Sequence, residues 1–172
     1  MTGPIQAVSA PIRHMVAADA DAVSQLIHRS WVATYGPLMG TDRATQESGK
    51  RHQPEMIAGS LVRPHAESFV AQTDEGAIVG YAYAIVVKGV LWLDRLHVAP
   101  SHHGTGLAAN LMHAVMVNYL GEPAISLEVI KGNDRAIRFY EREGFVVTGE
   151  TSACGGIGGI ASLIMRKPLP RA

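Results

Sequence analysis

The sequence has little of several features that would define a protein class at once. It contains one cysteine, Cys154, which excludes an internal disulfide bond and a cysteine-rich zinc site. Fifteen basic residues balance fifteen acidic ones, so the chain carries no general electrostatic signal for nucleic acid or for an anionic membrane. No apolar run approaches the roughly twenty residues that a membrane-spanning helix needs. We therefore expect no nucleic-acid partner and no membrane partner.

The N-terminal residues also lack the pattern of a signal peptide, because no basic segment precedes an apolar core there. Together with the single cysteine, this leads us to expect a soluble, cytoplasmic protein. The length of 172 residues suits one domain with a substantial core. We expect residues 1–10 to form a flexible tail and residues 11–169 to form that single domain.

The hydrophobic pattern predicts an α+β fold, since its period changes from helical to two near residue 67. The expected strands lie at 11–15, 67–72, 77–87, 90–98, 124–130, 145–148 and 161–167. The expected helices lie at 19–35 (stopped by Gly36-Pro37), 54–62, 107–119 and 133–142. We expect residues 41–53 to form a loop or frayed helix, and the glycine-rich segment 153–159 to be flexible. Short turns predict an antiparallel meander, and the helix at 107–119 predicts one parallel crossover. The sheet is thus central, mixed and mostly antiparallel.

A strand, a turn with two glycines and a helix follow one another between Leu91 and Ala109. Regular alternation along this strand predicts one face with Trp92, Asp94, Leu96 and Val98, and the other with Leu93, Arg95 and His97. The turn aims free backbone N–H groups and the positive end of the helix dipole at one point. That geometry binds phosphate, and Gly104 and Gly106 let the backbone come close to an anion.

Three phosphate-binding loops compare with this turn. A Walker A loop is excluded, because no lysine follows either glycine. The dinucleotide fingerprint is matched literally by Gly104, Gly106 and Ala109, and Glu128 follows about twenty residues later. Two details weaken the match to the dinucleotide fingerprint: residues 100–103 separate the strand from the glycines, and Glu128 falls in the middle of its strand and not at the end. A nucleotide and an acyl-CoA both remain open as ligands at this point.

The third loop is the acyl-CoA pyrophosphate loop of the GCN5-related N-acetyltransferase (GNAT) family, with the pattern Gln/Arg-x-x-Gly-x-Gly/Ala. The chain resembles it as His103-x-x-Gly106-x-Ala108, departing from it at His103. The segment from Asn133 to Phe145 is similar to the Asn-x-x-Ala-x-x-Phe-Tyr-x-x-x-Gly-Phe segment of the same family. On these two motifs the chain is identified as a member of the GNAT family.

The resemblance implies a fold and a ligand. The sheet would splay between the strands that end at Val98 and Ile130, and acetyl-CoA would lie in that cleft as co-substrate, with no metal. The backbone of Leu96, His97 and Val98 would pair with the pantetheine arm, and Asn133 would contact the CoA arm. Backbone amides would hold the pyrophosphate, namely those of His103, Gly104, Thr105, Gly106, Leu107 and Ala108.

The resemblance also implies the chemistry, a direct transfer of acetyl to an amine with both substrates bound. Tyr140 would give a proton to the leaving thiolate. The base stays open between Asp94, His97 and a water path. Trp31 and Tyr35 either line the acceptor pocket or pack in the core.

We expect an N-acetyltransferase acting on a primary amine of a small molecule: an amino acid, an amine metabolite or an antibiotic. The alternatives are a protein N-terminal or lysine acetyltransferase, a non-catalytic acyl-CoA sensor, and an NAD(P)-dependent oxidoreductase. The exposed edges of such a sheet can pair between copies, so a homodimer is a further expectation.

Overall fold

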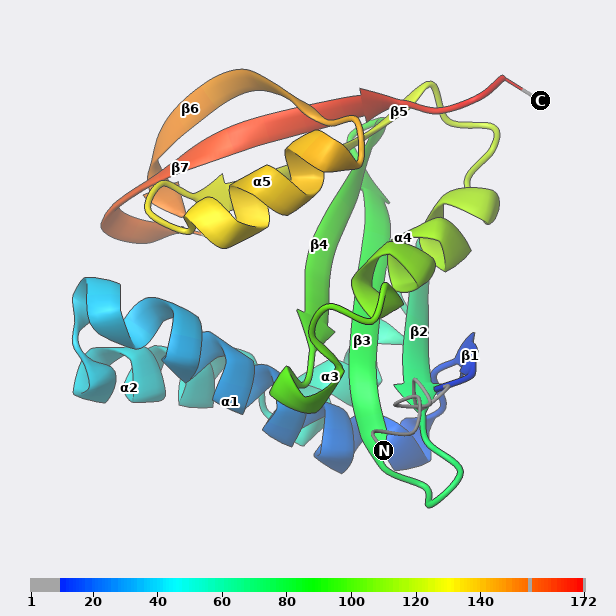
Figure 1. The fold of residues 1–172 in the computed structure, drawn as a ribbon, viewed down its shortest axis with the longest axis vertical. Helices are drawn as coiled ribbons and strands as arrows, with labels where there is room; N and C mark the ends of the chain where they lie inside the picture. Colours follow the sequence, from blue (N-terminus) through cyan, green and yellow to red (C-terminus); the bar gives the residue numbers. More distant parts are fainter. Residues whose placement is uncertain (1–9, 155, 172) are drawn as a thin grey trace, which may run out of the picture.

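The computed structural model describes residues 10–154 and 156–171, which form a seven-stranded sheet and five α-helices (Figure 1). The predicted α+β fold, a mixed sheet flanked by helices, is confirmed. All but one residue of the predicted 1–10 tail lie outside the described residues. The strands are β1 (Ile12–His14), β2 (Ala66–Gln72), β3 (Ile78–Val87), β4 (Val90–Val98), β5 (Ala124–Ile130), β6 (Val146–Cys154) and β7 (Ile157–Pro168). The helices are α1 (Ala20–Met39), α2 (Thr41–Arg51), α3 (Pro54–Ser60), α4 (Leu107–Val117) and α5 (Asp134–Arg142).

The sheet runs in the order β1-β2-β3-β4-β5-β7-β6 and splays in the middle. Neighbouring strands pair antiparallel except β4 and β5, which are parallel. These two pair only at Leu91↔Ile125 and Trp92↔Ser126. Beyond Trp92 they part, and in Figure 1 β5, β6 and β7 lie above the end of β4. One side of β4 is therefore left open, as the predicted splay requires.

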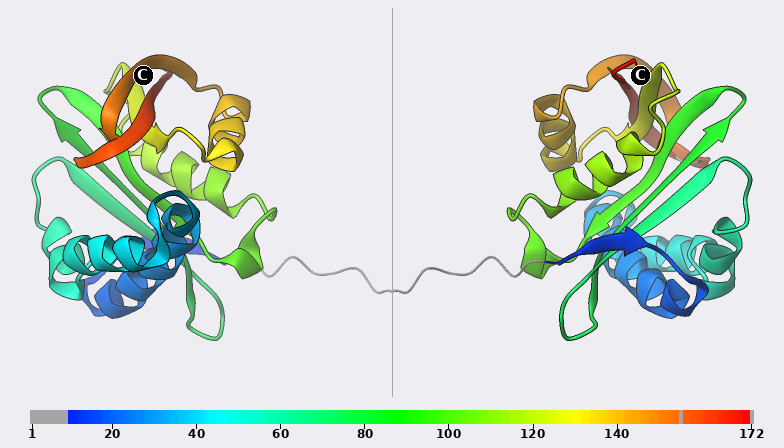
Figure 2. Two further views of the ribbon diagram at one scale, coloured as in Figure 1. Left: turned by 90° about the vertical axis from the view of Figure 1, so that its left-hand side faces the viewer. Right: turned by 90° about the vertical axis from the view of Figure 1, so that its right-hand side faces the viewer.

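Each face of the sheet packs on helices (Figure 2). On one face α4 lies close to β3, where a Cβ atom on Gly80 would come within 2.7 Å of Leu111 Cδ1. Glycine at position 80 therefore lets the helix approach the strand. On the other face, α1 and α3 bury Val23, Leu26, Ile27 and Ile57 against the tyrosines of β3. Among the described residues, no helix has the length and apolarity needed to cross a bilayer.

A β-bulge interrupts β4 and corrects the predicted alternation. Tyr83 pairs with Arg95 and Ala84 pairs with Leu93, so Asp94 is an extra residue in β4. Because of this extra residue, Leu93 and Leu96 contact the same core cluster and do not point to opposite faces. The predicted face shared by Trp92, Asp94, Leu96 and Val98 is therefore wrong.

The segment from residue 20 to residue 51 is more helical than predicted. Helix α1 continues through Gly36 and Pro37 and ends at Met39. Gly40, at φ 90°, then terminates the helix. The proline is tolerated because it lies in the last turn. Of the two structures predicted for 41–53, a loop or a frayed helix, the loop is wrong, since residues 41–51 form the regular helix α2. Helix α2 buries only Ala44 and Ser48, so its sequence carries almost no apolar period.

The glycine-rich segment is also more regular than predicted. Strands β6 and β7 extend into it, and Ala153 pairs with both Gly158 and Ile160 across irregular register. The hydroxyl of Thr151 donates to the Ala153 carbonyl at 2.8 Å, inside the bulged hairpin. Bulges let glycines sit within a strand ladder, so the glycine content that led us to expect a flexible segment is also compatible with paired strands.

Candidate functional site

A cleft of about 280 Å³ lies where β4 and β5 part. It brings together seven of the residues that the sequence suggested for the acetyltransferase site: Trp31, Tyr35, Asp94, Leu96, His97, Asn133 and Tyr140. The predicted residues Val98 and 103–108 lie outside its lining. The other lining residues come from α1, the end of α2, β4, β5 and α5: Ser30, Thr34, Arg51, His52, Leu93, Arg95, Glu128, Val129, Ile130 and Ala136.

The open side of β4 presents backbone hydrogen-bonding groups to the splay. Ala99 N–H donates to the Val79 carbonyl at 2.8 Å, so its backbone groups face β3. Backbone groups alternate sides along an antiparallel strand, so those of Leu96 and Val98 face away from β3. This edge suits an extended ligand with amide groups, as it would suit an added strand. The backbone of His97 faces β3, and its side chain lines the cleft.

The turn between β4 and α4 requires its two glycines. Gly104 and Gly106 have φ angles of 75° and 83°, where a side chain would be strained. The Thr105 hydroxyl donates to the His102 carbonyl at 2.6 Å and fastens the turn. Helix α4 begins at Leu107, and the N–H groups of its first turn have no acceptor within the helix. The turn therefore presents the positive end of α4 to an anion.

The two histidines of this turn hold its shape. Nε2 of His103 lies 2.9 Å from the Val98 carbonyl, so His103 ties the turn back to the end of β4. His102 is buried, and its Nδ1 lies 2.9 Å from the Ser101 hydroxyl. One ring nitrogen of each imidazole is thus engaged within this part of the chain, whereas Nε2 of His102 is buried without a hydrogen-bond partner in residues 10–154 and 156–171.

Tyr140 lies on α5 and reaches the cleft. Its ring packs edge-on against Phe139 and Phe145, with centroids 5.2 and 5.6 Å away. Burial raises the pKa of the Tyr140 phenol to about 12. The phenol is therefore protonated at neutral pH, as a proton donor must be.

Asn133 begins α5 as predicted. Its side-chain oxygen accepts a hydrogen bond from Ala136 N–H at 3.3 Å, which is an N-cap. Since Asn133 also lines the cleft, this bond fixes its side chain at the wall.

The two side chains considered as bases both line the cleft, although regular alternation put them on opposite faces. Nδ1 of His97 lies 3.0 Å from the Ser30 hydroxyl. Burial, and then the charge of Arg95, lowers the pKa of His97 to about 4, so its imidazole is neutral at pH 7. Asp94 is exposed at the bulge, with a carboxylate oxygen 3.7 Å from Arg95 Nε.

A second cavity, of about 340 Å³, shares part of its wall with the cleft. The rings of Trp31 and Tyr35 stack there, with centroids 4.0 Å apart, and Trp92 adds a third aromatic side chain. The charged residues of this lining are both acidic, Asp94 and Glu128. An aromatic, acidic lining suits a cation. The expectation that Trp31 and Tyr35 line a pocket agrees with this arrangement.

Sequence reasoning missed Arg51 and His52, which it placed in a loop. His52 is buried, and its ring lies edge-on to Trp31 with centroids 4.9 Å apart. Burial, and then the charge of Arg95, lowers the pKa of His52 to about 3. The signal that was available is a stripe at spacing i, i+4, formed by Ala44, Ser48 and His52.

Comparison with known proteins relates this site to a family. The family model "Acetyltransferase (GNAT) family" matches residues 22–145. An uncharacterized N-acetyltransferase of Mycobacterium tuberculosis is 31% identical over 136 residues, which cover 76% of this chain and 85% of that protein. The spermine/spermidine N(1)-acetyltransferase of Bacillus subtilis is 33% identical over 88 residues, covering 44% of this chain and 57% of that protein.

A solved structure agrees in fold. The PaiA N-acetyltransferase from Thermoplasma acidophilum, in complex with coenzyme A, superposes with a TM-score of 0.79 and 19% identity. The match covers 93% of this chain and 99% of that one. The chain, whose two motifs meet around a splayed sheet, belongs to the GNAT family of acetyltransferases and is an N-acetyltransferase.

Proposed function

We propose that this enzyme moves the acetyl group of acetyl-CoA directly to a primary amine of a small molecule, with both substrates bound in one complex. One observation carries the proposal: the open edge of β4, Tyr140 and an acidic aromatic cavity meet around one cleft. The Bacillus subtilis relative is named for acetylation of spermine and spermidine, which are amines, and this supports the acceptor class.

Acetyl-CoA fits the backbone side of the site. The backbone groups of Leu96 and the N–H of Val98 on the open edge of β4 match the spaced amides of a pantetheine arm, while the Val98 carbonyl accepts from His103. The amides of residues 103–108 would hold the pyrophosphate at the positive end of α4. Asn133 would contact the arm from α5, and the coenzyme A in the Thermoplasma acidophilum structure supports such a ligand.

The acceptor would enter from the acidic aromatic cavity. A protonated amine is attracted to the faces of Trp31 and Tyr35 and to the carboxylates of Asp94 and Glu128. The Ser162 hydroxyl donates to Glu128 Oε1 at 2.6 Å, which orients that carboxylate. The cavity of about 340 Å³ suits a small molecule.

The reaction then needs three proton movements. The ammonium loses one proton before its nitrogen attacks the acetyl carbonyl carbon, and the nitrogen loses a second proton as the C–N bond forms and the C–S bond breaks. The leaving thiolate takes the proton of the Tyr140 phenol, and the second nitrogen proton, passed on through solvent, restores that phenol. Holding both substrates in one cleft supplies most of the rate enhancement.

The test is thiol release from acetyl-CoA in the presence of spermidine, lysine, benzylamine, an aminoglycoside and a lysine-containing peptide. We expect release with at least one small amine, and calorimetric binding of acetyl-CoA without any amine. Release with the peptide alone would overturn the small-molecule acceptor. Acetyl-CoA binding without release from any amine would favour a non-catalytic acyl-CoA module.

A further inference from the structure

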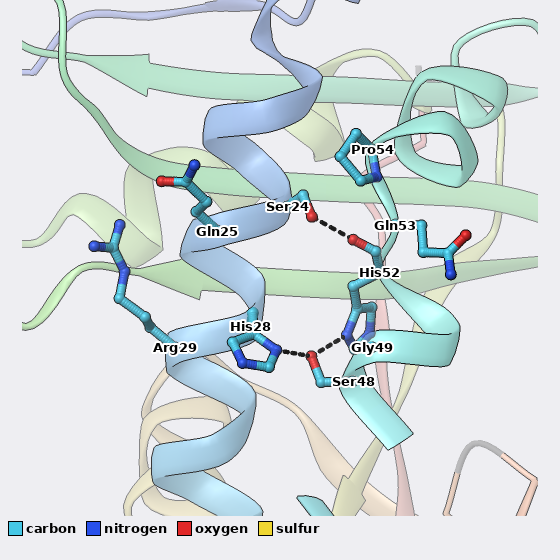
Figure 3. A pocket seen from close by; sticks show the side chains of 9 residues that line it. All are labelled: Ser24, Gln25, His28, Arg29, Ser48, Gly49, His52, Gln53 and Pro54. Carbon is cyan, nitrogen blue, oxygen red and sulfur yellow. Dashed lines mark hydrogen bonds between the residues drawn. The ribbon is translucent and has the colours of Figure 1, made fainter. Parts of the chain in front are cut away.

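A third cavity, of about 360 Å³, lies between α1 and the end of α2 (Figure 3). His52 lines both this cavity and the cleft, so it connects the two. Its lining includes three exposed polar residues, Gln25, Arg29 and Gln53. The third cavity therefore joins His52 to solvent by a route separate from the acceptor cavity.

Three side chains form a continuous hydrogen-bonded row along this route. Nδ1 of His28 on α1 lies 2.9 Å from the Ser48 hydroxyl on α2. The same hydroxyl lies 2.9 Å from Nδ1 of His52. Figure 3 shows the two imidazoles meeting at the Ser48 oxygen. Ser48 is 1% exposed, whereas His28 is half-buried at the third cavity, so the row runs from buried to accessible.

Burial and nearby charge make His52 a poor resting base. Burial comes first and the charge of Arg95 second, and together they lower the pKa of its imidazole to about 3. An imidazolium that persisted at this position would be strongly disfavoured. A proton taken up there must move on at once.

We propose that His28, Ser48 and His52 form a proton relay that carries the proton of the acceptor ammonium from the cleft to solvent at the third cavity. The relay rests on the proposed function, since it serves the amine of that reaction. His52 meets the substrate, and Ser48 and His28 are positioning residues that act through it.

The proton balance closes within the row. The ammonium proton goes to Nε2 of His52 while the proton on its Nδ1 moves to the Ser48 oxygen. The Ser48 proton moves to Nδ1 of His28, and Nε2 of His28 releases its proton to solvent. One proton enters and one leaves, and no ring holds a net charge. Water reaching the cleft after product release restores the starting tautomers.

A second serine hydroxyl at the third cavity, that of Ser24, has a structural role. Ser24 donates to the backbone carbonyl of His52 and so fastens the end of α2 to α1. Ser24 also lines the third cavity but contacts neither imidazole nitrogen of the row. It therefore provides a matched control for Ser48.

The test compares Ser48→Ala with Ser24→Ala in the full chain, using acetyl-CoA and the panel amine with the highest kcat/KM. We expect Ser48→Ala to lower kcat about 100-fold at pH 7, the usual effect of losing proton abstraction. Its KM for acetyl-CoA should stay unchanged, and rising pH or added imidazole should restore part of the rate. Ser24→Ala should keep kcat within a few-fold and lose only melting temperature.

His28→Gln, a change at a half-buried position, repeats the test if Ser48→Ala does not fold. Equal kcat values for the wild type and either row variant would overturn the relay while leaving the proposed function intact. If no panel amine is acetylated, the proposed function fails instead, and nitrogen NMR of labelled histidines decides the relay. The tautomer populations of His28 and His52 should then be correlated with each other in the wild type and uncorrelated in Ser48→Ala. Independent populations in the wild type would overturn the relay.

Discussion

Two segments build the site by different means. The backbone wall, residues 96–108, offers mainly main-chain groups: the open edge of β4 and the amides before α4. The side-chain wall, residues 24–52, offers imidazoles, hydroxyls and aromatic rings from α1 and α2. Main-chain groups suit a ligand that is the same in every turnover, because any sequence with the right turns provides them.

The difference explains where chemical choice resides in this molecule. Exchanging a side chain on α1 or α2 alters the charge and shape of the acceptor site without touching the strand edge or the turn. A side-chain change on the backbone wall leaves its main-chain donors in place unless it adds charge or bulk. The predictions below test this division, from the largest expected effect to the smallest.

Tyr140→Phe should give the largest loss of activity, because it removes the proposed proton donor to the leaving thiolate. We expect kcat to fall by roughly 10² to 10⁴ with acetyl-CoA affinity and melting temperature preserved. Because burial raises the pKa of Tyr140 to about 12, the wild-type rate should show no basic limb from this phenol below about pH 11. Stopped assays of kcat between pH 6 and pH 10 check both points.

Tyr119→Phe is the matched control. Its buried phenol donates to the carbonyls of His65 and Ala84 at 3.1 and 3.2 Å, away from the cleft. This variant should lose melting temperature and keep kcat. If both variants behaved alike, Tyr140 would be a packing residue.

Ala108→Asp tests whether the backbone wall binds a pyrophosphate. A carboxylate in the first turn of α4 is favourable for the helix itself, so melting temperature should hold or rise. The same charge repels a pyrophosphate, so acetyl-CoA should bind about tenfold or more weakly, and more so at low salt. Calorimetry at two salt concentrations measures this. Asn110→Asp adds the same charge at the next exposed position and should matter less; equal losses would argue against an anion at the turn.

Asp94→Asn tests the acceptor side with a smaller effect. Losing one carboxylate from the acidic cavity should raise the KM of a cationic amine about fivefold, near 1 kcal/mol, while acetyl-CoA affinity stays the same. Initial rates at varied amine concentration measure this, with Asp74→Asn in the β2–β3 turn as control. A change in acetyl-CoA affinity alone would show that Asp94 acts on acetyl-CoA and not on the amine.

The last test measures stability, and not activity, on the side-chain wall. The pKa of His52 is about 3 in the folded protein against a usual 6.5, so between these values the unfolded chain binds more protons. The free energy of unfolding should therefore fall as pH drops from 6.5 toward 3, by at most about 1.4 kcal/mol per pH unit. Melting curves from pH 7 to pH 4 should be flatter for His52→Gln. Parallel curves would show that His52 is not held neutral by the fold.

The same division decides how much could be predicted from the sequence. Strand β5 and the Asn133 cap were predicted to the residue, because alternating apolar residues and a capping side chain act locally. The turn before α4 was predictable because positive φ angles demand glycine.

The side-chain wall was predicted poorly for a physical reason. Helix α2 buries a small residue and a hydroxyl, which give no apolar period, so Ser48 and His52 read as loop residues. The bulge at Asp94 depends on pairing with β3 and has no local signature. Long-range contacts fix both features, and a single sequence does not display such contacts.

The two-pair seam between β4 and β5 has a consequence for how cooperatively the molecule unfolds. Strands β5, β7 and β6 form their own antiparallel ladder, and β1 to β4 form another. Across the seam, backbone pairing is limited to the positions of Leu91 and Trp92. We therefore expect any sub-global opening to follow this line, with each half-sheet keeping its own amide protection, although one core cluster packs against both halves. A ligand lying along β4 would bridge the halves and make them unfold as one.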